Sequence, residues 1–528
     1  MAPVEHFDVI VLGAGISGIG AAHHLKNTWG AGTFVVLERR EMFGGTWDIF
    51  RYPGIRTDSD MFTFGYEHRP WPSDRPIAER AEILAYLRGA IVDGGLDEHI
   101  RYGEEAISAV WESEKGLWTL TTGKGNVFTC RFLQTCLGFY EDEPYKPVFE
   151  GADDFTAAGG TIIHPYRWPE GHHVAEKRIA VVGSGATAIT LIPSLTKMGA
   201  SHVTMVQRSP GYIVPMRNSD PIAAAALKEG LPLAEMHSRV REAKAEEMQV
   251  MRQVRENRTL EQRDRAFIKM MRNEVPKELM DDEEFKKHFT PRYNVWQQRL
   301  CLAPDSDFFQ CLRARTASVV TGTIDKFDNK GILMKDGTRV DCDIIVTATG
   351  FILHQNMPMG AMKVVVDGVP YRSVDHAMYK DCMLSDMPNF MFVKGYQFIS
   401  WTMKVDLVCK HLCRLLEFMQ EKGIKKVVPK VPASGIGPSP GPPMNSGYIQ
   451  RSVHTFTKHG SKVPWAPLLD YTADKALLLQ DPVEHDCLEL EYFGHQEQHE
   501  QQHEQHLLAN PSSSSSSSSP TYLQRSKL

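Results

Sequence analysis

The chain has 528 residues, of which 42% are hydrophobic and 23% are charged, and its formal net charge is −6 at neutral pH. A chain of this length is expected to form several domains whose cores need neither disulfides nor metal. The lack of long basic runs argues against nucleic-acid binding, and no apolar stretch approaches the ~20 residues of a transmembrane segment. Nine scattered cysteines, an odd number, predict a reducing compartment. We expect no signal peptide, because a strand begins almost at once.

Residues 7–40, FDVIVLGAGISGIGAAHHLKNTWGAGTFVVLERR, predict a strand, a helix and a second strand. Gly13, Gly15 and Gly18 permit a tight turn, close approach of the backbone to a pyrophosphate and close packing of the helix. The N-terminus of that helix offers free N–H groups to phosphate. Glu38 follows about 20 residues later, where an acid binds ribose hydroxyls. The unit predicts binding of FAD or NAD.

A second glycine turn follows in GGTWDIFRYPGIRTDSDMFTFGY, residues 44–66. Its small residues would allow close approach to a flavin. Tyr52 and the distant Trp401 are candidate aromatics of a substrate pocket, although packing in the core would also explain either of them. The candidate cofactor contacts of this turn are Gly45, Thr46, Trp47, Asp48 and Tyr52.

A rigid segment, GGTIIHPYRWPEG, occupies residues 159–171. We interpret residues 151–174 as a linker between two nucleotide-binding units. Prolines and a large aromatic would make this linker stiff, and packing at a domain interface is an alternative explanation for its aromatic side chains. The residues of interest are Gly160, His164, Trp168 and Pro169.

The strand–helix–strand pattern returns at residues 177–210, with Gly183, Gly185 and Ala188 in the turn. The second strand ends at Arg208 and Ser209, with no acid at the ribose position. An arginine and a hydroxyl suit the 2′-phosphate of NADP, although a solvated strand-end arginine would look the same. The second unit therefore predicts NADPH.

Two dinucleotide sites in one chain indicate electron transfer between cofactors, and the economical assignment is FAD in the first unit and NADPH in the second. The strand in CDIIVTATGF, residues 342–351, ends at Thr349 and Gly350, where the chain would cross back between domains. We expect an α/β fold with two Rossmann-like dinucleotide-binding domains. The predicted boundaries are 1–150 for the FAD domain, 175–350 for the NADPH domain, and 351–480 for the return into the FAD domain.

The second domain contains a charged segment, about 219–288, that is rich in helix-forming residues. We predict a helical insert packed over the active site.

The linker motif resembles the fingerprint of the class B flavoprotein monooxygenases, F-x-G-x-x-x-H-x-x-x-W followed by Pro or Asp. Ala158 stands where that fingerprint has Phe. With Trp168 at the last aromatic position, the motif resembles that of the Baeyer–Villiger branch. The N- and S-oxygenating branch usually carries Tyr or Phe there. Three further stretches resemble the family in the right order: 44–66, 293–309 (YNVWQQRLCLAPDSDFF) and 395–416 (GYQFISWTMKVDLVCKHLCRLL).

The resemblance implies a reaction in which a peroxyflavin inserts one atom of molecular oxygen into a hydrophobic ketone, giving an ester or lactone. Arg299 is then the catalytic cation, since negative charge develops on oxygen, and Asp58 orients it; a surface salt bridge is the alternative explanation for Arg299. Many relatives carry Lys where Gln298 stands, so NADPH preference would depend more on Arg208. The alternatives are an N- or S-oxygenating enzyme, and a flavin- and NADPH-binding redox protein or oxidase that does not oxygenate a substrate.

Low-complexity sequence begins at about residue 494 and continues to 528. His495, His499 and His503 have a spacing that can bind metal, but this composition favours a flexible tail, and we expect no metal site. The chain ends in Ser526, Lys527 and Leu528, the signal read by the peroxisomal import receptor. This ending predicts a peroxisomal protein.

Overall fold

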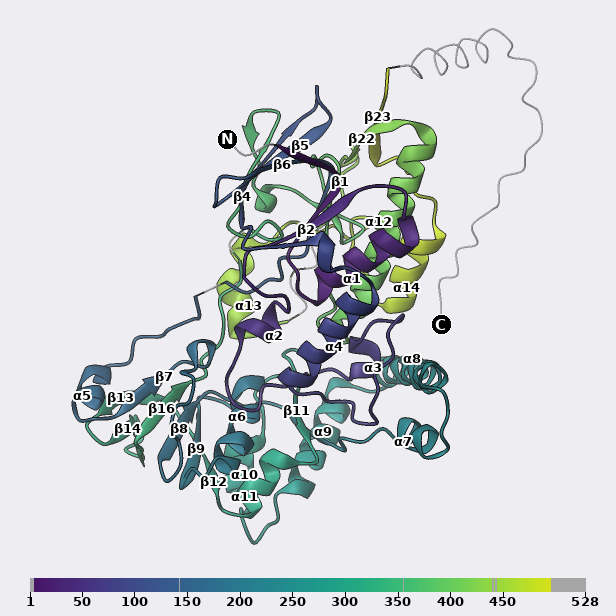
Figure 1. Cartoon of the computed structure of the whole chain (residues 1–528). Helices are drawn as coiled ribbons and strands as arrows, with labels where there is room; N and C mark the ends of the chain where they lie inside the picture. Colours follow the sequence, from purple (N-terminus) through teal and green to yellow (C-terminus); the bar gives the residue numbers. More distant parts are fainter. Residues whose placement is uncertain (1–3, 142, 355, 439–440, 442–443, 495–528) are drawn as a thin grey trace.

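A computed structural model describes residues 4–494 except 142, 355, 439, 440, 442 and 443. It contains two α/β domains, with the first and last parts of the chain in one and the middle in the other (Figure 1). The expected fold class is confirmed. Among the described residues, no helix is both long enough and apolar enough to cross a bilayer.

The first domain is built on a nine-stranded sheet in the order β18-β17-β4-β5-β6-β1-β2-β3, with β21 beside β6. The apolar run in residues 9–12 forms the buried half of β1, which is parallel to both β2 and β6; burial on both faces is typical of a parallel sheet. The strands are β1 (Glu5–Leu12), β2 (Phe34–Glu38), β3 (Ile100–Tyr102), β4 (Ala106–Glu112), β5 (Leu117–Thr122), β6 (Val127–Thr135), β17 (Lys363–Val366), β18 (Val369–Pro370) and β21 (Phe390–Phe392).

Helix α12 (Trp401–Lys422) packs against α1 (Ile16–His24), and the two lie side by side in Figure 1. The chain after residue 351 therefore returns to complete the first domain. The other elements of this domain are α2 (Thr46–Ile49), α3 (Met61–Phe64), α4 (Arg80–Asp93), α13 (Gly447–Ser452), α14 (Tyr471–Lys475), β19 (Met378–Tyr379), β20 (Met383–Leu384), β22 (Ile424–Pro429) and β23 (Leu488–Tyr492).

The second domain has a parallel five-stranded sheet in the order β12-β9-β8-β16-β7. Strand β7 lies inside the segment that we interpreted as a linker, so that segment forms an edge of the second sheet. The elements are β7 (Thr161–Ile163), β8 (Arg178–Val182), β9 (His202–Gln207), β12 (Ala317–Thr321), β16 (Ile344–Thr347), the antiparallel β13 (Ile324–Asp328), β14 (Gly331–Met334) and β15 (Arg339–Asp341), the pair β10 (Ile213–Met216) and β11 (Cys301–Pro304), and helices α5 (Ala152–Ala157), α6 (Ala186–Lys197) and α11 (Asp307–Arg313).

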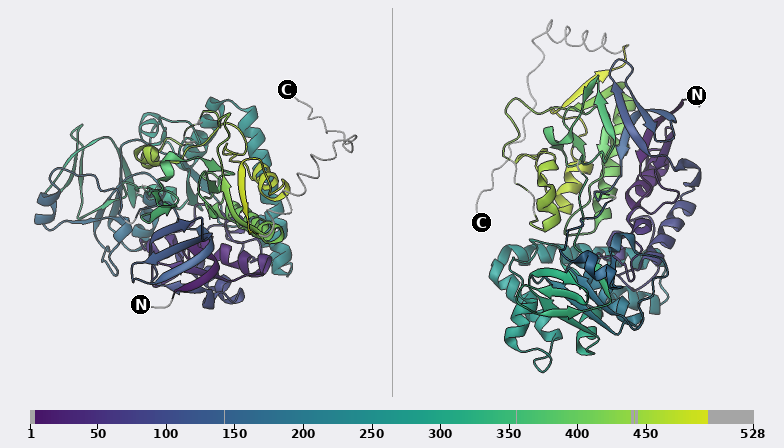
Figure 2. Two further views of the ribbon diagram at one scale, coloured as in Figure 1. Left: turned by 90° about the horizontal axis from the view of Figure 1, so that it is seen from above. Right: turned by 90° about the vertical axis from the view of Figure 1, so that its left-hand side faces the viewer.

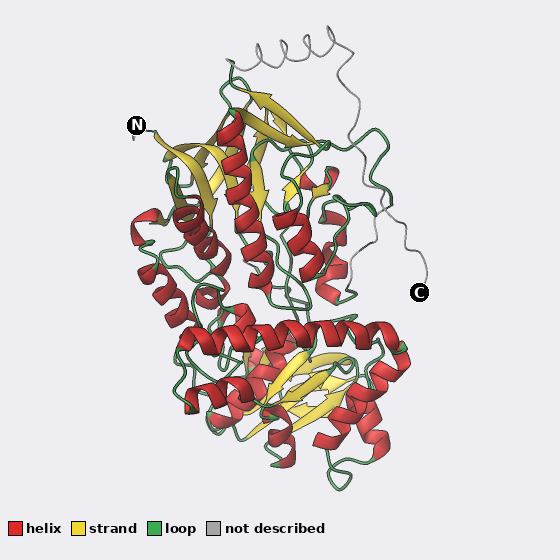
Figure 3. Ribbon diagram, turned by 90° about the vertical axis from the view of Figure 1, so that its right-hand side faces the viewer, coloured by secondary structure: helices red, strands yellow, loops and turns green. Residues whose placement is uncertain are grey.

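The predicted insert is helical, and its helices are α7 (Pro221–Lys228), α8 (Leu233–Asn257), α9 (Leu260–Glu274) and α10 (Asp282–Phe289). Helix α8 runs across the junction of the two domains (Figure 3). Arg241 of α8 donates to the Phe62 carbonyl of α3 at 2.7 Å, and Arg252 pairs with Asp470 at 2.9 Å. The insert thus braces the second domain against the first.

The two chain crossings between the domains run side by side. Tyr140 and Leu353 form an antiparallel β-bridge, and the N–H of Glu141 donates to the Ile352 carbonyl at 2.9 Å. Seen from the side, the two domains are stacked one upon the other (Figure 2).

Candidate active site between two nucleotide cradles

A cavity of about 1470 Å³ lies between the domains. Pockets for one drug-sized ligand are typically ~300–1,000 Å³, so this cavity has room for more than one ligand. Its walls include both glycine turns, Arg208 and Arg299. The sequence placed these features in separate segments, and the fold brings them around one space.

The first glycine turn joins β1 to α1. Gly13 has a φ of +99°, and a Cβ there would lie 2.8 Å from the Cys136 carbonyl oxygen. A Cβ at Gly18 would lie 1.7 Å from the Gly13 carbonyl oxygen, so only glycine allows α1 to start this close to the strand. Gly15 precedes the first residue of α1, whose free N–H groups can bind an anion.

Glu38 ends β2 and faces the same cavity. The backbone N–H of Ala14 donates to one of its carboxylate oxygens at 2.7 Å, and that of Arg40 donates to the other at 2.9 Å. Burial raises the pKa of Glu38, and these two hydrogen bonds oppose the shift. The acid is held beside the glycine turn, where a ribose would bind.

The second glycine turn joins β8 to α6. Gly183 has a φ of +134°, and a Cβ there would lie 2.3 Å from the Ala348 carbonyl oxygen. At Gly185, by contrast, a Cβ would meet no described protein atom within 4 Å. Gly185 lines the cavity, so its missing side chain leaves room for a ligand.

Arg208 and Ser209 follow β9 and line the cavity near this second turn. Arg451 of the first domain approaches from the other side, with its guanidinium 3.8 Å from the centre of the Tyr145 ring. Burial lowers the pKa of Arg451, and the positive charge of Arg208 lowers it further. Two neighbouring cations at this end of the cavity favour an anionic ligand.

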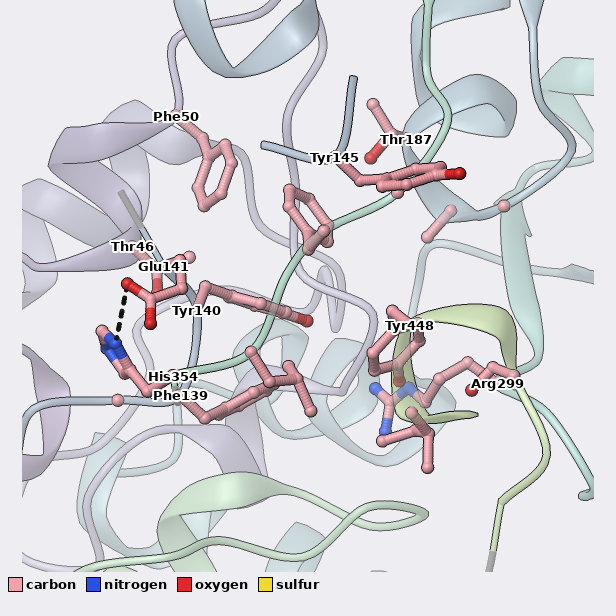
Figure 4. A pocket seen from close by; sticks show the side chains of 18 of the residues that line it. Thr46, Phe50, Phe139, Tyr140, Glu141, Tyr145, Thr187, Arg299, His354 and Tyr448 are labelled. Carbon is pink, nitrogen blue, oxygen red and sulfur yellow. Dashed lines mark ion pairs between the residues drawn. The ribbon is translucent and has the colours of Figure 1, made fainter. Parts of the chain in front are cut away.

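Arg299 and Asp58 come from different domains and meet in the cavity as an ion pair. Arg299 also donates to the Gln397 carbonyl, and Tyr448 lies beside its guanidinium (Figure 4). Burial alone would lower the pKa of Arg299, but the Asp58 carboxylate outweighs burial and raises it. The guanidinium is therefore a fixed positive charge.

His164, from the fingerprint segment, lines the cavity as well. Its Nδ1 accepts a hydrogen bond from the Tyr166 N–H at 3.1 Å, and its Nε2 is buried with no hydrogen-bond partner among the described residues. Burial lowers the pKa of His164 to about 4, so the ring is neutral near pH 7 and carries its proton on Nε2. The Nε2 proton is thus a buried donor without a described partner at the edge of the cavity.

The structure separates the sequence candidates into two groups. The cavity is lined by Gly13, Gly15, Glu38, Gly45, Thr46, Trp47, Tyr52, Asp58, His164, Gly183, Gly185, Arg208, Ser209, Arg299, Thr349, Gly350 and Trp401. Among the described residues, the candidates that do not line it are Gly18, Asp48, Gly160, Trp168, Pro169 and Ala188.

Asp48 departs from expectation. Its buried carboxylate pairs with Arg40 at 2.7 Å, Arg51 at 3.0 Å and Arg80 at 3.7 Å. Asp48 therefore holds arginines around α2 and does not line the cavity. The helical insert also differs from expectation, because none of its described residues lines the large cavity.

Several residues that line the cavity were not predicted from the sequence. His354 and Glu141, one from each domain crossing, form an ion pair at 3.4 Å (Figure 4). Tyr140 and Phe351, also on the two crossings, have ring centres 4.5 Å apart. The only available sequence signal was that all four follow strands that end between the domains.

The chemistry of these side chains fits two different dinucleotides. The first cradle presents an acid to ribose, which suits FAD, and the second presents cations, which suit a 2′-phosphate. A fixed cation lies between them. Fold and site together define a flavin-dependent oxidoreductase with two nucleotide cradles.

Comparison with known proteins agrees. Residues 10–271 match the family model described as pyridine nucleotide-disulphide oxidoreductase. The chain is 40% identical over 488 residues to the FAD-containing monooxygenase EthA of Mycobacterium tuberculosis, covering 92% of this chain and 97% of the relative. It is 38% identical over 501 residues to the probable FAD-binding monooxygenase AlmA of an Acinetobacter species, covering 93% and 98%.

Solved structures share the fold. Cyclohexanone monooxygenase bound to ε-caprolactone superposes with a TM-score of 0.71 at 22% identity, covering 92% of this chain and all of that one. Steroid monooxygenase bound to NADP superposes with a TM-score of 0.70 at 21% identity, with the same coverage of both chains. The chain belongs to the FAD-containing monooxygenases, and its resemblance to the class B flavoproteins is confirmed.

Proposed function

We propose that the chain is an NADPH-dependent Baeyer–Villiger monooxygenase that converts a hydrophobic ketone to an ester or lactone. One atom of molecular oxygen enters the product and the other leaves as water, with two electrons supplied by NADPH. The observation that carries the proposal is Arg299, a fixed cation in a cavity that both nucleotide cradles share. The structures named for cyclohexanone and steroid monooxygenases support it through their common fold.

The residues of this chain have separate parts in that reaction. Flavin, when bound, supplies the redox chemistry that activates oxygen. Arg299 stabilises negative charge that develops on the carbonyl oxygen of the substrate, because a preorganised charge in a water-poor site acts strongly on the transition state. Asp58 positions the Arg299 guanidinium.

Apolar side chains support a hydrophobic substrate. The aromatic rings of Phe50 and Phe351 pack with their centres 5.3 Å apart, and Phe139 stacks on Trp401 at 5.2 Å. All four line the cavity. Such walls bind an apolar body and leave the polar groups to orient its reactive carbonyl.

The test is consumption of NADPH by the FAD-loaded protein in the presence of ketones, sulfides and amines, with product mass determined. We expect ketones to gain one oxygen atom as esters, with consumption coupled to product. Sulfoxide or N-oxide products without ester would instead establish heteroatom oxygenation. NADPH consumption that yields only hydrogen peroxide with every substrate would contradict the proposal.

A further inference from the structure

A smaller cavity of about 380 Å³ adjoins the end of the large one in the second domain. Arg208, Pro210, Gly322 and Thr323 line both cavities, so the two are adjacent. Three further cations line the smaller cavity, namely Lys286, Lys287 and Arg292. The insert, none of whose described residues lines the large cavity, supplies the two lysines.

The end of α10 is fixed against the sheet, which sets the position of both lysines. Phe285 and Phe289 are 5% and 0% exposed and anchor the helix in the core. His288 Nδ1 lies 2.8 Å from the Thr321 hydroxyl oxygen, and the side-chain amide of Gln207 donates to the His288 carbonyl at 2.8 Å. Gln207 and Thr321 end β9 and β12, so α10 is tied to the same sheet edge that Arg208 follows.

These cations are not neutralised by close carboxylates. Within residues 4–494 as described, Arg208, Lys286, Lys287 and Arg292 form no ion pair within 4.0 Å, although Lys287 acts at longer range on Asp336. Cations in the last turn of a helix interact favourably with the helix dipole. That effect explains the lysines of α10 but not Arg208 and Arg292, which lie outside it and face the same cavity.

Gln298 lines the large cavity but carries no charge. Its side-chain amide donates to the Asn445 side chain of the first domain at 3.2 Å. An amide carries no charge, so this position gives no electrostatic contribution to phosphate binding. The further cations near Arg208 are those that line the smaller cavity.

We propose that Lys286 and Lys287 of the insert, with Arg292, bind the 2′-phosphate of NADPH together with Arg208 and so set the preference for NADPH over NADH. This inference rests on the proposed NADPH dependence. A dianionic phosphate gains from several surrounding cations, and NADH offers no group for them. The insert would then determine coenzyme choice instead of covering the substrate.

The test is calorimetric binding of NADP⁺ and of NAD⁺ to the FAD-loaded protein. Removing two partly solvated charges in Lys286→Gln/Lys287→Gln should weaken NADP⁺ binding roughly tenfold, while NAD⁺ binding changes less than about twofold. Arg292→Gln should give a smaller effect in the same direction. Raising the salt concentration should reduce the difference between the parent and the double variant.

A matched control is Lys228→Gln/Lys269→Gln, which removes two exposed charges from α7 and α9, away from this cavity. It should bind NADP⁺ as the parent does; if it weakens binding equally, net charge and not this cavity is responsible. A double variant at Lys286 and Lys287 that keeps parent affinity for NADP⁺ would overturn the inference and leave Arg208 as the determinant. If the parent binds NAD⁺ as tightly as NADP⁺, the proposed NADPH dependence itself fails.

Discussion

Arg299 shows how single residues acquire a role from the fold. It lies 241 positions from Asp58 in the sequence, and the two meet only because the second domain folds over the first. Its second contact, the Gln397 carbonyl, comes from the returning part of the first domain. Three segments thus hold one guanidinium in place, which is the preorganisation that charge stabilisation requires.

Replacing Arg299 with alanine should abolish ester formation while the protein still binds flavin. Loss of one preorganised charge commonly costs ~3 kcal/mol at the transition state, a hundredfold or more in rate. Flavin reduction by NADPH should slow less, and Asp58→Asn should give a milder defect because it acts through the arginine. Stopped-flow reduction and product analysis measure both steps.

Arg299→Lys is the matched control, since it keeps the charge but loses the two-sided fork that contacts Asp58 and Gln397. We expect activity between that of the parent and of Arg299→Ala. Ester formation by Arg299→Ala at near-parent rates would disprove the assigned role.

Single functional residues can be predicted from the sequence where they stand at a fixed spacing or within a family motif. The glycines, Glu38 and Arg208 stand at fixed offsets in a strand–helix–strand unit and were predictable. The direction of Asp48 toward three arginines was not, because it depends on Arg80 of a separate helix. The Glu141–His354 pair joins positions 213 residues apart, since 354 − 141 = 213, and no local pattern specifies such a contact.

The turn between β8 and α6 contains two glycines that are needed for different reasons. Gly183 is required by the protein itself, because a Cβ there would collide with the Ala348 carbonyl. Gly185 precedes α6 with a φ of −81°, which any residue adopts, and no described atom would touch its Cβ. The same turn therefore contains one glycine for folding and one that leaves space for a ligand.

Gly185→Ala should leave the fold and FAD content unchanged but weaken NADP⁺ binding, since the added methyl would occupy the path of the pyrophosphate. We expect roughly a tenfold or greater rise in Kd, equal to about 1.4 kcal/mol. Gly183→Ala should instead reduce the yield of folded protein. Flavin absorbance, thermal unfolding and NADP⁺ titration separate the two outcomes; unchanged NADP⁺ affinity in Gly185→Ala would show that the nucleotide does not pass this turn.

For the helical insert, the sequence predicted the helices but not the elements against which they pack. Its helix-forming composition identified the helices, and α7 to α10 occupy the predicted range. Their direction of packing was wrong, because amphipathic sequence says which face is buried but not against which partner. Helix α8 covers α3 at the domain junction, and α10 covers the edge of the second sheet.

For the whole molecule, the domains are joined by apolar packing as well as by polar contacts: one buried cluster includes apolar residues of both domains. Arg56 of the first domain pairs with Asp307 of α11 at 2.5 Å, and Arg241 of α8 reaches the Phe62 carbonyl. The paired crossings around Tyr140 and Leu353 form the covalent connection. Both cradles open on the cavity between the domains, so a hinge at these crossings would change the distance between the two nucleotides.

Ser526, Lys527 and Leu528 lie outside the described residues, as do His495, His499 and His503. We propose that the final tripeptide directs the enzyme to peroxisomes, because the import receptor reads this signal at a free C-terminus. A fluorescent protein followed by residues 495–528 should enter peroxisomes in eukaryotic cells. Deleting the tripeptide, or extending the chain beyond Leu528, should leave it in the cytosol; equal distribution of all three fusions would show that this tail is not an address.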